Sequence, residues 1–197
     1  MDAVIIDSGG ANLASLQFAF ERLGARTQVT TDLAVIRSAP RVVLPGVGAA
    51  ANAMQRLHDC GVAAVLPGLK QPVLGICLGM QLLFRHSEEG DTACLGIIPE
   101  TVRRLRPAPG LPVPHMGWNQ LAGLREDPLL AGIGTNDYVY FVHSYAAQVS
   151  PLTLATADYG TAVSAVVRKD NFWGAQFHPE RSAGTGARVL ANFLRLE

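Results

Sequence analysis

The residues with the clearest chemical potential are a cysteine between two glycines and a histidine close to a carboxylate. Cys77 stands in the stretch GICLG, between Gly75 and Gly79, where an apolar run typical of a strand gives way to a helical pattern. His178 and Glu180 belong to the stretch QFHPE, much later in the chain. A thiol, a base and a group that orients the base are what nucleophilic acyl chemistry requires.

The surroundings of Cys77 predict a nucleophile on a sharp strand-to-helix turn. Such a turn holds the backbone in strained geometry and requires small flanking residues, which Gly75 and Gly79 provide. Unpaired N–H groups at the start of the following helix favour the thiolate, so the sulfur is expected to be reactive near neutral pH. The alternative is an inert core residue, because free cysteines are often buried.

His178 is the best candidate for the base among the five histidines. It follows a strong strand signal and has a carboxylate two residues away, and Pro179 stiffens the link between them. His143 lies in another strand-like run without such a companion. Cys77, His178 and Glu180 then form a triad in the order nucleophile, base, orienter. A histidine near a glutamate at a strand end can also be a simple surface pair.

The glycine-rich stretch LPGVGAA predicts donors for an oxyanion. Its glycines permit positive φ and allow a backbone N–H to point into a crevice at the carboxyl end of a sheet. The N–H groups of Val47 and Leu78 are the expected pair, and each such donor is typically worth about 3 to 4 kcal/mol in the transition state. An ordinary turn between a strand and a helix is the alternative.

Other motifs argue against a metal or a cofactor. The stretch DSGGANL lacks both the GxGxxG pattern and the lysine of a phosphate loop, and the histidines lack ligand spacing. Cys60, Cys77 and Cys94 form no CxxC pair and are odd in number, which disfavours a zinc cage or a complete disulfide framework. We therefore expect no metal and no cofactor.

The composition predicts one α/β domain over residues 1–197. Hydrophobic residues make up 49% of the 197 residues and charged residues only 16%, which suits a sheet covered on both faces. The 16 basic residues balance the 16 acidic ones, so nothing favours nucleic acid or an anionic membrane as a partner. The first residues resemble no export signal and no run is long enough for a membrane helix, so we expect a cytoplasmic protein.

Hydrophobic periodicity places these candidates on alternating elements. The first half predicts strands over 2–7, 27–32, 41–44 and 72–77, and helices over 11–24, 33–39, 49–69 and 78–87. This alternation predicts a mostly parallel sheet with right-handed crossovers. The second half predicts mixed or antiparallel strands added to one side, within 138–145, 152–157 and 162–170, then a last strand over 171–179 and a helix over 186–196.

Taken together, GICLGMQ, LPGVG and QFHPERS resemble the signature of the class I glutamine amidotransferases. With DSGGANLASL, PHMGWN and YFVHSY, the whole chain resembles in particular the glutaminase subunits of imidazole glycerol phosphate synthase. This resemblance implies a flavodoxin-like α/β fold. It also implies hydrolysis of L-glutamine to glutamate and ammonia.

The resemblance implies a role for each site residue. Cys77 would form a γ-glutamyl thioester, His178 would give a proton to leaving ammonia and then activate water, and Glu180 would orient His178. The substrate glutamine would be held by four residues: Gly46, Gln81, Ser144 and Tyr145.

A partner is implied as well, a (β/α)8 barrel cyclase subunit called HisF. Ammonia would pass through it and convert N′-(5′-phosphoribulosyl)formimino-AICAR to imidazole glycerol phosphate and AICAR. The family's glutaminase is nearly silent without this partner, which suggests that the PGVG peptide must turn to complete the oxyanion hole. Residues expected on or near the partner face are Asn12, Trp118, Tyr140 and Arg181, with ordinary packing as the alternative for each.

The amino-terminal loop departs from the pattern of the family. Many relatives carry a DYGxGNL pattern where this chain has Ser8 and Ala11, so the resemblance does not extend to the detailed contacts of that loop. The alternative functions are a glutaminase subunit of pyridoxal phosphate synthase or of anthranilate or aminodeoxychorismate synthesis, and a non-catalytic binding module on the same fold. PHMGWN and YFVHSY argue against the first group, and an intact triad argues against the second.

Overall fold

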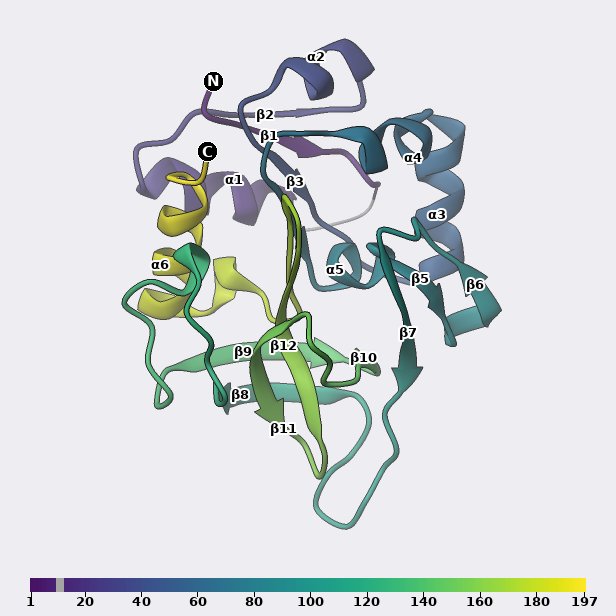
Figure 1. Cartoon of the computed structure of the whole chain (residues 1–197), viewed down its shortest axis with the longest axis vertical. Coiled ribbons are helices and arrows are strands. Elements are labelled where there is room, and N and C mark those ends of the chain that lie inside the picture. The colour runs from purple at the N-terminus through teal and green to yellow at the C-terminus, as the bar shows by residue number, and fades with distance from the viewer. Residues whose placement is uncertain (10–12) are drawn as a thin grey trace.

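The computed structural model describes residues 1–9 and 13–197 and centres on a seven-stranded sheet (Figure 1). The strand order is β11-β12-β13-β4-β3-β1-β2. The parallel strands are β1 (Ala3–Ile6), β2 (Thr27–Thr30), β3 (Val42–Leu44), β4 (Val73–Ile76) and β13 (Phe172–Ala175). The antiparallel strands β12 (Ala162–Lys169) and β11 (Thr153–Asp158) extend one edge. The predicted α/β class, with a mostly parallel sheet and added antiparallel strands, is confirmed.

Helices cover both faces of this sheet. They are α1 (Leu13–Arg22), α2 (Leu33–Ser38), α3 (Ala50–Asp59), α4 (Val62–Val65), α5 (Leu78–Leu82) and α6 (Ala183–Phe193). Figure 1 shows α1 and α6 on one side of the sheet, and α3, α4 and α5 on the other. Successive residues of a strand point to opposite faces of the sheet. Ile5 therefore belongs to the core on one face, with Phe20 of α1 and Leu190 of α6, whereas Val4 belongs to the core on the other face, with Leu57 of α3. The continuous apolar strands of the sequence follow from this double burial.

Two smaller sheets lie beside the main one. The first has the order β10-β7-β5-β6 and the second pairs β8 with β9. Their strands are β5 (Phe84–Ser87), β6 (Thr92–Ala93), β7 (Ile98–Arg104), β8 (His115–Gln120), β9 (Tyr138–His143) and β10 (Tyr145–Ala147). Short 3-10 helices are η1 (Leu66–Gly68), η2 (Glu89–Asp91), η3 (Pro128–Leu130) and η4 (Pro179–Arg181). The expected strand over 138–145 is thus split between these two sheets, whereas β11 and β12 join the main one.

The helix predicted over 78–87 is wrong in its second half. The helix α5 ends at Leu82, and Phe84–Ser87 form β5, which pairs with β6 and β7. Every residue of α5 is buried, so the stretch has no polar face from which a helical period can be read. The stretch Phe84–Ser87 has only four residues, too few for its own period to be distinguished from the end of the preceding helix. The closing helix α6 also begins three residues earlier than predicted, at Ala183.

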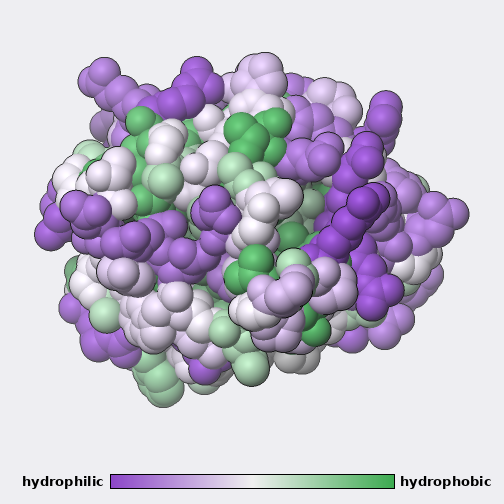
Figure 2. All heavy atoms as spheres, turned by 90° about the horizontal axis from the view of Figure 1, so that it is seen from below, coloured by the Kyte–Doolittle hydropathy of each residue, from purple (hydrophilic) through white to green (hydrophobic). Residues whose placement is uncertain are grey.

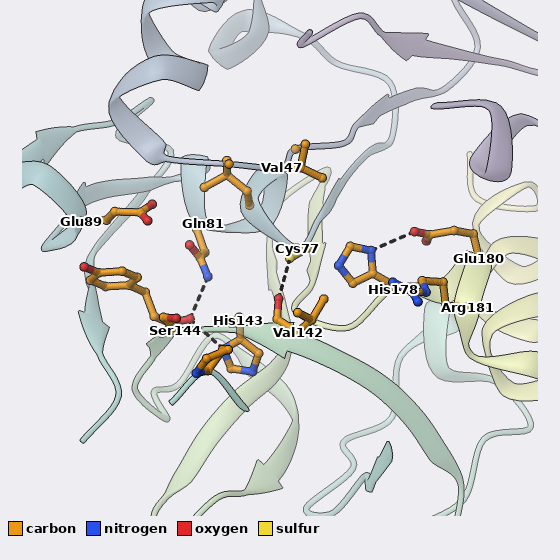
Figure 3. A pocket seen from close by; sticks show the side chains of 15 residues that line it. Val47, Cys77, Gln81, Glu89, Val142, His143, Ser144, His178, Glu180 and Arg181 are labelled. Carbon is orange, nitrogen blue, oxygen red and sulfur yellow. Dashed lines mark hydrogen bonds and ion pairs between the residues drawn. The ribbon is translucent and has the colours of Figure 1, made fainter. Parts of the chain in front are cut away.

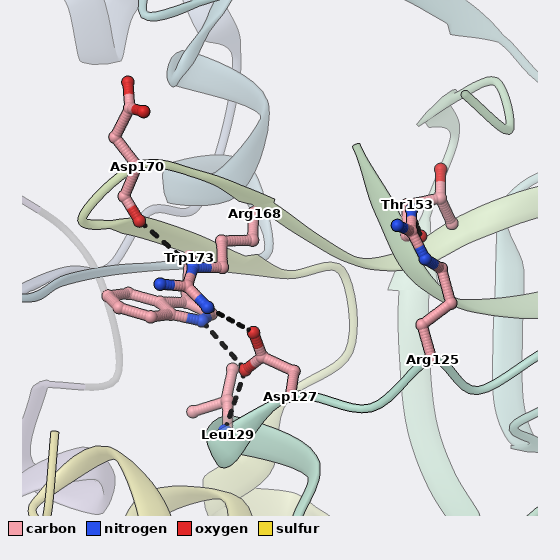
Figure 4. Close-up of polar contacts among 7 residues, drawn as sticks. All are labelled: Arg125, Asp127, Leu129, Thr153, Arg168, Asp170 and Trp173. Carbon is pink, nitrogen blue, oxygen red and sulfur yellow. Dashed lines mark hydrogen bonds and ion pairs between the residues drawn. The ribbon is translucent and has the colours of Figure 1, made fainter. Parts of the chain in front are cut away.

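A buried carboxylate fastens the antiparallel edge of the sheet to the segment before η3 (Figure 4). The Oδ1 atom of Asp127 accepts hydrogen bonds from the Leu129 N–H at 2.8 Å and the Trp173 Nε1–H at 3.1 Å. Its Oδ2 atom accepts from the Arg168 guanidinium at 2.8 Å, and that guanidinium stacks 4.5 Å above the Trp173 ring. Because β12 and β13 carry Arg168 and Trp173, this cluster holds the strand that leads to His178.

Candidate active site

Cys77 occupies a strained turn between β4 and α5. Its φ of 54° and ψ of −111° are a backbone conformation that residues other than glycine seldom adopt. The turn is held by hydrogen bonds from the Cys77 N–H to the Ala175 carbonyl at 2.8 Å and from the Gln81 N–H to the Cys77 carbonyl at 3.2 Å. The structure thus has the turn geometry predicted from GICLG.

The glycines around this turn are required by close backbone contact. A Cβ at Gly79 would lie 1.8 Å from the Leu44 carbonyl oxygen, and one at Gly75 would lie 2.7 Å from the Gly79 oxygen. A Cβ at Gly46 would lie 2.8 Å from the Gly79 nitrogen. The end of β3 therefore packs directly on the cysteine turn, which brings the PGVG segment beside Cys77.

His178 and Glu180 face each other next to Cys77 (Figure 3). The His178 Nδ1 lies 2.8 Å from the Glu180 Oε1. The His178 N–H donates to the Tyr140 carbonyl at 3.0 Å, and the Ser182 hydroxyl donates to the His178 carbonyl at 2.7 Å. Cys77, His178 and Glu180 line one cavity of about 400 Å³. The structure therefore brings together all three residues predicted as a triad.

The electrostatic surroundings keep His178 protonated. Burial lowers its pKa, but hydrogen bonds to Cys77 and Glu180, and the negative charges of these two groups, outweigh burial and raise the pKa to about 10. A protonated His178 can donate a proton to a leaving group bound next to the Cys77 sulfur. Glu180 on the other side of the ring stabilises that charge.

Val47 and Leu78 lie on the wall of the same cavity, together with Gly46 and Gly48. Gly48 has a φ of 84°, so the PGVG segment uses the conformational freedom predicted for it. The Ser8 hydroxyl donates to the Pro45 carbonyl at 3.0 Å and anchors the start of this segment. The assignment of Val47 and Leu78 as oxyanion donors stays a prediction.

Three further residues predicted to hold substrate, Gln81, Ser144 and Tyr145, also line the cavity. The Gln81 Nε2 donates to the Tyr145 carbonyl at 2.8 Å and to the Gln176 Oε1 at 3.0 Å. With its nitrogen used in this way, Gln81 keeps its Oε1 as an acceptor. The cavity therefore suits a substrate that presents an N–H donor there.

His143 also reaches the cavity, but in a different state from His178. Burial lowers its pKa to about 4, and its Nδ1 donates to the Tyr145 carbonyl at 2.8 Å. Its Nε2 lies 3.1 Å from the Nδ1 of His115, whose pKa burial also lowers to about 4. A neutral imidazole with both nitrogens engaged is a poor proton shuttle. This arrangement favours His178 as the base.

Glu89 is a cavity residue that the sequence did not single out. It lies in η2, and its Oε2 accepts a hydrogen bond from the Ala50 N–H at the start of α3, at 2.8 Å. Glu88 and Glu89 precede Gly90 in the sequence without any motif, so no local signal distinguishes Glu89 from a solvated acid. Only the fold places its carboxylate near Gln81, on the wall of the cavity that Cys77 also lines (Figure 3).

Three of the four residues predicted near a partner lie together. The Arg181 guanidinium stacks 4.6 Å above the Tyr140 ring, and Trp118 meets that ring edge-on with centroids 6.0 Å apart. Trp118 is 52% exposed and Arg181 lines the cavity, so the aromatic group borders the site. Asn12 lies outside the described residues.

The face on the side of β8 and β9 carries exposed apolar side chains, namely Met116, Trp118 and Tyr138. Figure 2 shows the face seen from below Figure 1, where hydrophobic and intermediate residues are interspersed with hydrophilic ones. Within residues 1–9 and 13–197, no group of three or more His, Cys, Asp or Glu side chains is arranged to hold a metal ion. Over the same ranges, no helix has the length and apolar character needed to cross a membrane.

Comparison with solved structures identifies the fold. A crystal structure of a glutamine amidotransferase superposes with a TM-score of 0.76 at 16% identity, covering 98% of this chain and 97% of that one. A glutamine amidotransferase from Thermotoga maritima gives a TM-score of 0.67 at 16% identity, covering 94% of this chain and 79% of that one. At these identities the likeness concerns the fold alone.

Sequence comparison identifies the family to which the chain belongs. The model of the class I glutamine amidotransferases matches residues 4–196. The imidazole glycerol phosphate synthase subunit HisH of Xanthomonas euvesicatoria pv. vesicatoria is 55% identical over 195 residues, covering 99% of this chain and 98% of that protein. The HisH subunit of Xylella fastidiosa strain Temecula1 is 52% identical, covering 100% and 98%. The chain therefore belongs to the class I glutamine amidotransferases, in the HisH family of imidazole glycerol phosphate synthase subunits.

Proposed function

We propose that this chain, as a single domain over residues 1–197, hydrolyses L-glutamine at Cys77 and supplies the ammonia to a cyclase subunit in histidine biosynthesis. The observation that carries the proposal is the strained Cys77 turn facing the His178–Glu180 pair inside one cavity. A nucleophile, a proton donor and an orienting carboxylate are the parts that amide hydrolysis needs.

In the first step, the Cys77 sulfur attacks the side-chain carbonyl carbon of glutamine. The carbonyl oxygen becomes negatively charged, and the N–H groups of Val47 and Leu78 stabilise it. Both residues border the cavity next to Cys77. Donors placed where charge develops are usually the largest single contribution to such a reaction.

In the second step, His178 gives its proton to the leaving nitrogen, and ammonia departs from the tetrahedral intermediate, which leaves a γ-glutamyl thioester on Cys77. The raised pKa of His178, about 10, means that this proton is present at neutral pH. The neutral imidazole then takes a proton from water as the water attacks the thioester and releases glutamate. Glu180 holds the Nδ1 side of the ring throughout.

The cavity offers complementary groups for the amino acid end of glutamine. Gln81 and Glu89 present acceptors, which suit the α-ammonium group of the substrate. Gly46, Ser144 and Tyr145 complete the wall around it.

Ammonia must reach the second reaction without meeting bulk water, because ammonium is no nucleophile and forms readily near neutral pH. We propose the (β/α)8 barrel cyclase HisF as the partner that receives it. There ammonia converts N′-(5′-phosphoribulosyl)formimino-AICAR to imidazole glycerol phosphate and AICAR. The exposed Trp118 and the partly buried Tyr140, on which Arg181 stacks, support docking beside the cavity.

The compartment proposed for this complex is the cytoplasm. All three cysteines are free, and Cys60 and Cys94 are only partly buried. Free, accessible thiols are typical of proteins kept in a reducing compartment.

The test is a glutaminase and synthase assay of Cys77→Ala and Cys77→Ser in the complex with the barrel cyclase and its nucleotide ligand. Both variants should lose glutamine-dependent synthesis, while synthesis from added ammonium persists because the cyclase is intact. Loss of both activities, or normal glutamine use, would overturn the role of Cys77. Absence of Cys77 labelling by a glutamine-mimicking alkylator in the full complex would instead favour a non-catalytic module.

A further inference from the structure

A fully buried carboxamide, Gln176, lies beside the proposed nucleophile and has no part in the steps described above. It follows β13 and is 0% exposed. Its Nε2 lies 3.9 Å from the Cys77 sulfur and its Oε1 lies 3.0 Å from the Gln81 Nε2. A buried amide at this place has two possible orientations, one presenting N–H to the sulfur and one presenting oxygen.

The Tyr145 carbonyl decides between these orientations. This oxygen can only accept, so both groups that contact it must donate: Gln81 through Nε2 and His143 through Nδ1, each at 2.8 Å. Gln81 therefore has its nitrogen on this side, and the second hydrogen of that nitrogen is directed to Gln176. Gln176 must accept with its oxygen, which leaves its nitrogen facing Cys77.

The same carbonyl also fixes the tautomers of the imidazole pair His143 and His115. Because the His143 Nδ1 donates to Tyr145, its Nε2 must accept, and it does so from the His115 Nδ1 at 3.1 Å. His115 is held between the rings of Phe141 and Tyr159, with centroids 4.7 and 4.0 Å away. The Tyr145 carbonyl thus fixes the hydrogen positions on both sides, in the imidazole pair and from Gln81 through Gln176 to the sulfur.

We propose that Gln176 is an additional donor to the Cys77 sulfur, which favours the thiolate form and aims it into the cavity. The proposal rests on the function proposed for Cys77 as a nucleophile. A hydrogen bond to the charged form of a group favours that form, and sulfur contacts are long and weak individually. Removal of the donor should therefore shift the thiol equilibrium rather than abolish it.

Other groups around the sulfur also influence the balance between thiol and thiolate at Cys77. The Val142 carbonyl lies 3.8 Å from the sulfur and accepts the S–H of the thiol, so it disfavours the thiolate. Titratable and charged groups lining the same cavity are Glu89, His143, Tyr145, His178, Glu180 and Arg181. Cys77 and Glu180 both raise the pKa of His178, so His178 and Cys77 titrate as a coupled pair, and the midpoint is compared between variants in which both remain.

The experiment measures the rate of Cys77 alkylation by iodoacetamide in the full chain from about pH 5 to 9, with peptide mass spectrometry to separate Cys77 from Cys60 and Cys94. Gln176→Met keeps the length of the side chain and removes the donor. Gln176→Glu places an oxygen toward the sulfur. Gln55→Met, at an exposed position on α3, is the matched control.

The midpoint of the alkylation profile should rise by roughly 0.5 to 1 pH unit in Gln176→Met, which corresponds to a three- to tenfold slower reaction below the midpoint. It should rise further in Gln176→Glu and stay unchanged in Gln55→Met. Thermal unfolding of each variant shows whether the protein is folded. Gln81→Met is a second test: it should raise the alkylation midpoint by less than Gln176→Met does, because it frees the Gln176 amide to turn.

Coincident profiles for wild type, Gln176→Met and Gln176→Glu would overturn the proposal. That result is distinct from failure of the proposed function. If the wild-type complex hydrolyses no glutamine while the alkylation midpoint still depends on Gln176, the donor role stands and the glutaminase assignment fails. If the wild-type complex hydrolyses glutamine but the alkylation midpoints coincide, the glutaminase assignment stands and the donor role of Gln176 fails.

Discussion

Gly79 packs against the Leu44 carbonyl so closely that a Cβ at position 79 would lie 1.8 Å from that oxygen. The atom in the way is backbone of β3, which cannot swing aside as a flexible side chain can. We expect Gly79→Ala to lower the free energy of unfolding by more than about 3 kcal/mol, or to prevent folding. Gly68→Ala, where nothing lies within 4 Å of the new atom, is the control. Equal urea midpoints for the two variants would contradict this view of the cysteine turn.

Glu180→Gln tests the electrostatics of His178. Burial lowers the pKa of His178, and contacts with Cys77 and Glu180 raise it to about 10. Removal of the Glu180 charge should lower this pKa, measured by NMR titration of the imidazole, and should slow glutamine turnover by about 100-fold. The exposed Glu126→Gln variant should leave both unchanged.

The same pKa predicts how stability depends on pH. Because the folded pKa of His178 lies above its unfolded value, its contribution is complete below about pH 6.5 and is lost as the pH rises toward 10. Urea unfolding should therefore show a steeper loss of stability over this alkaline range in wild type than in Glu180→Gln. Parallel curves would show that the pKa of His178 does not depend on Glu180.

His115 and His143 predict the opposite behaviour in acid. Burial lowers the pKa of both to about 4, below the unfolded value, so stability present above about pH 6.5 is lost as the pH falls toward 4. Each histidine should account for roughly 1 to 2 kcal/mol between pH 7 and 5. His115→Phe keeps a ring between Phe141 and Tyr159 and should flatten the acid limb of the unfolding curve. An unaltered limb would exclude His115 as its source.

Asp127 predicts a contrast between a buried and an exposed ion pair. Asp127→Ala removes acceptors for Leu129, Arg168 and Trp173, and we expect a loss of about 2 to 3 kcal/mol in unfolding free energy. The KM for glutamine should not change, because the cluster does not line the cavity. In Asp91→Asn, which removes the charge of a 97% exposed side chain and tolerates the φ of 50° at this position, stability should stay within about 0.5 kcal/mol of wild type. Equal losses would contradict the structural role of Asp127.

The hydrogen bonds of Ser8 connect the amino-terminal loop to the PGVG segment. Its hydroxyl donates to the Pro45 carbonyl, and the Arg56 guanidinium donates to the carbonyl of Ser8 at 3.1 Å and to that of Gly9. Ser8→Ala should cost about 1 kcal/mol of stability and lower kcat several-fold at unchanged KM, because Val47 is no longer held at one end. Ser38→Ala, at an exposed position, should do neither. A fall in stability with unaltered kcat would limit Ser8 to a structural role.

The sequence predicted those features that depend on local chemistry. The alternation of apolar runs with helical patterns predicted the parallel sheet, because strands buried on both faces must be continuously apolar. GICLG predicted a strained turn because only small neighbours permit one, and Cys77 has a φ of 54° there. QFHPE predicted the contact of His178 with Glu180, since the two residues are separated only by a proline, which restricts the backbone between them.

Tertiary structure alone decided the contacts between distant segments and the charge states of the histidines. Phe84–Ser87 became a strand because β7 offered a partner, which no local period records. Glu89 reached the cavity, His143 became neutral through burial, and Gln176 acquired a fixed orientation through Tyr145 and Gln81. The sequence by itself determined which residues can react. Burial and hydrogen bonds from remote segments determined their protonation and direction, because those depend on surroundings that only the folded chain assembles.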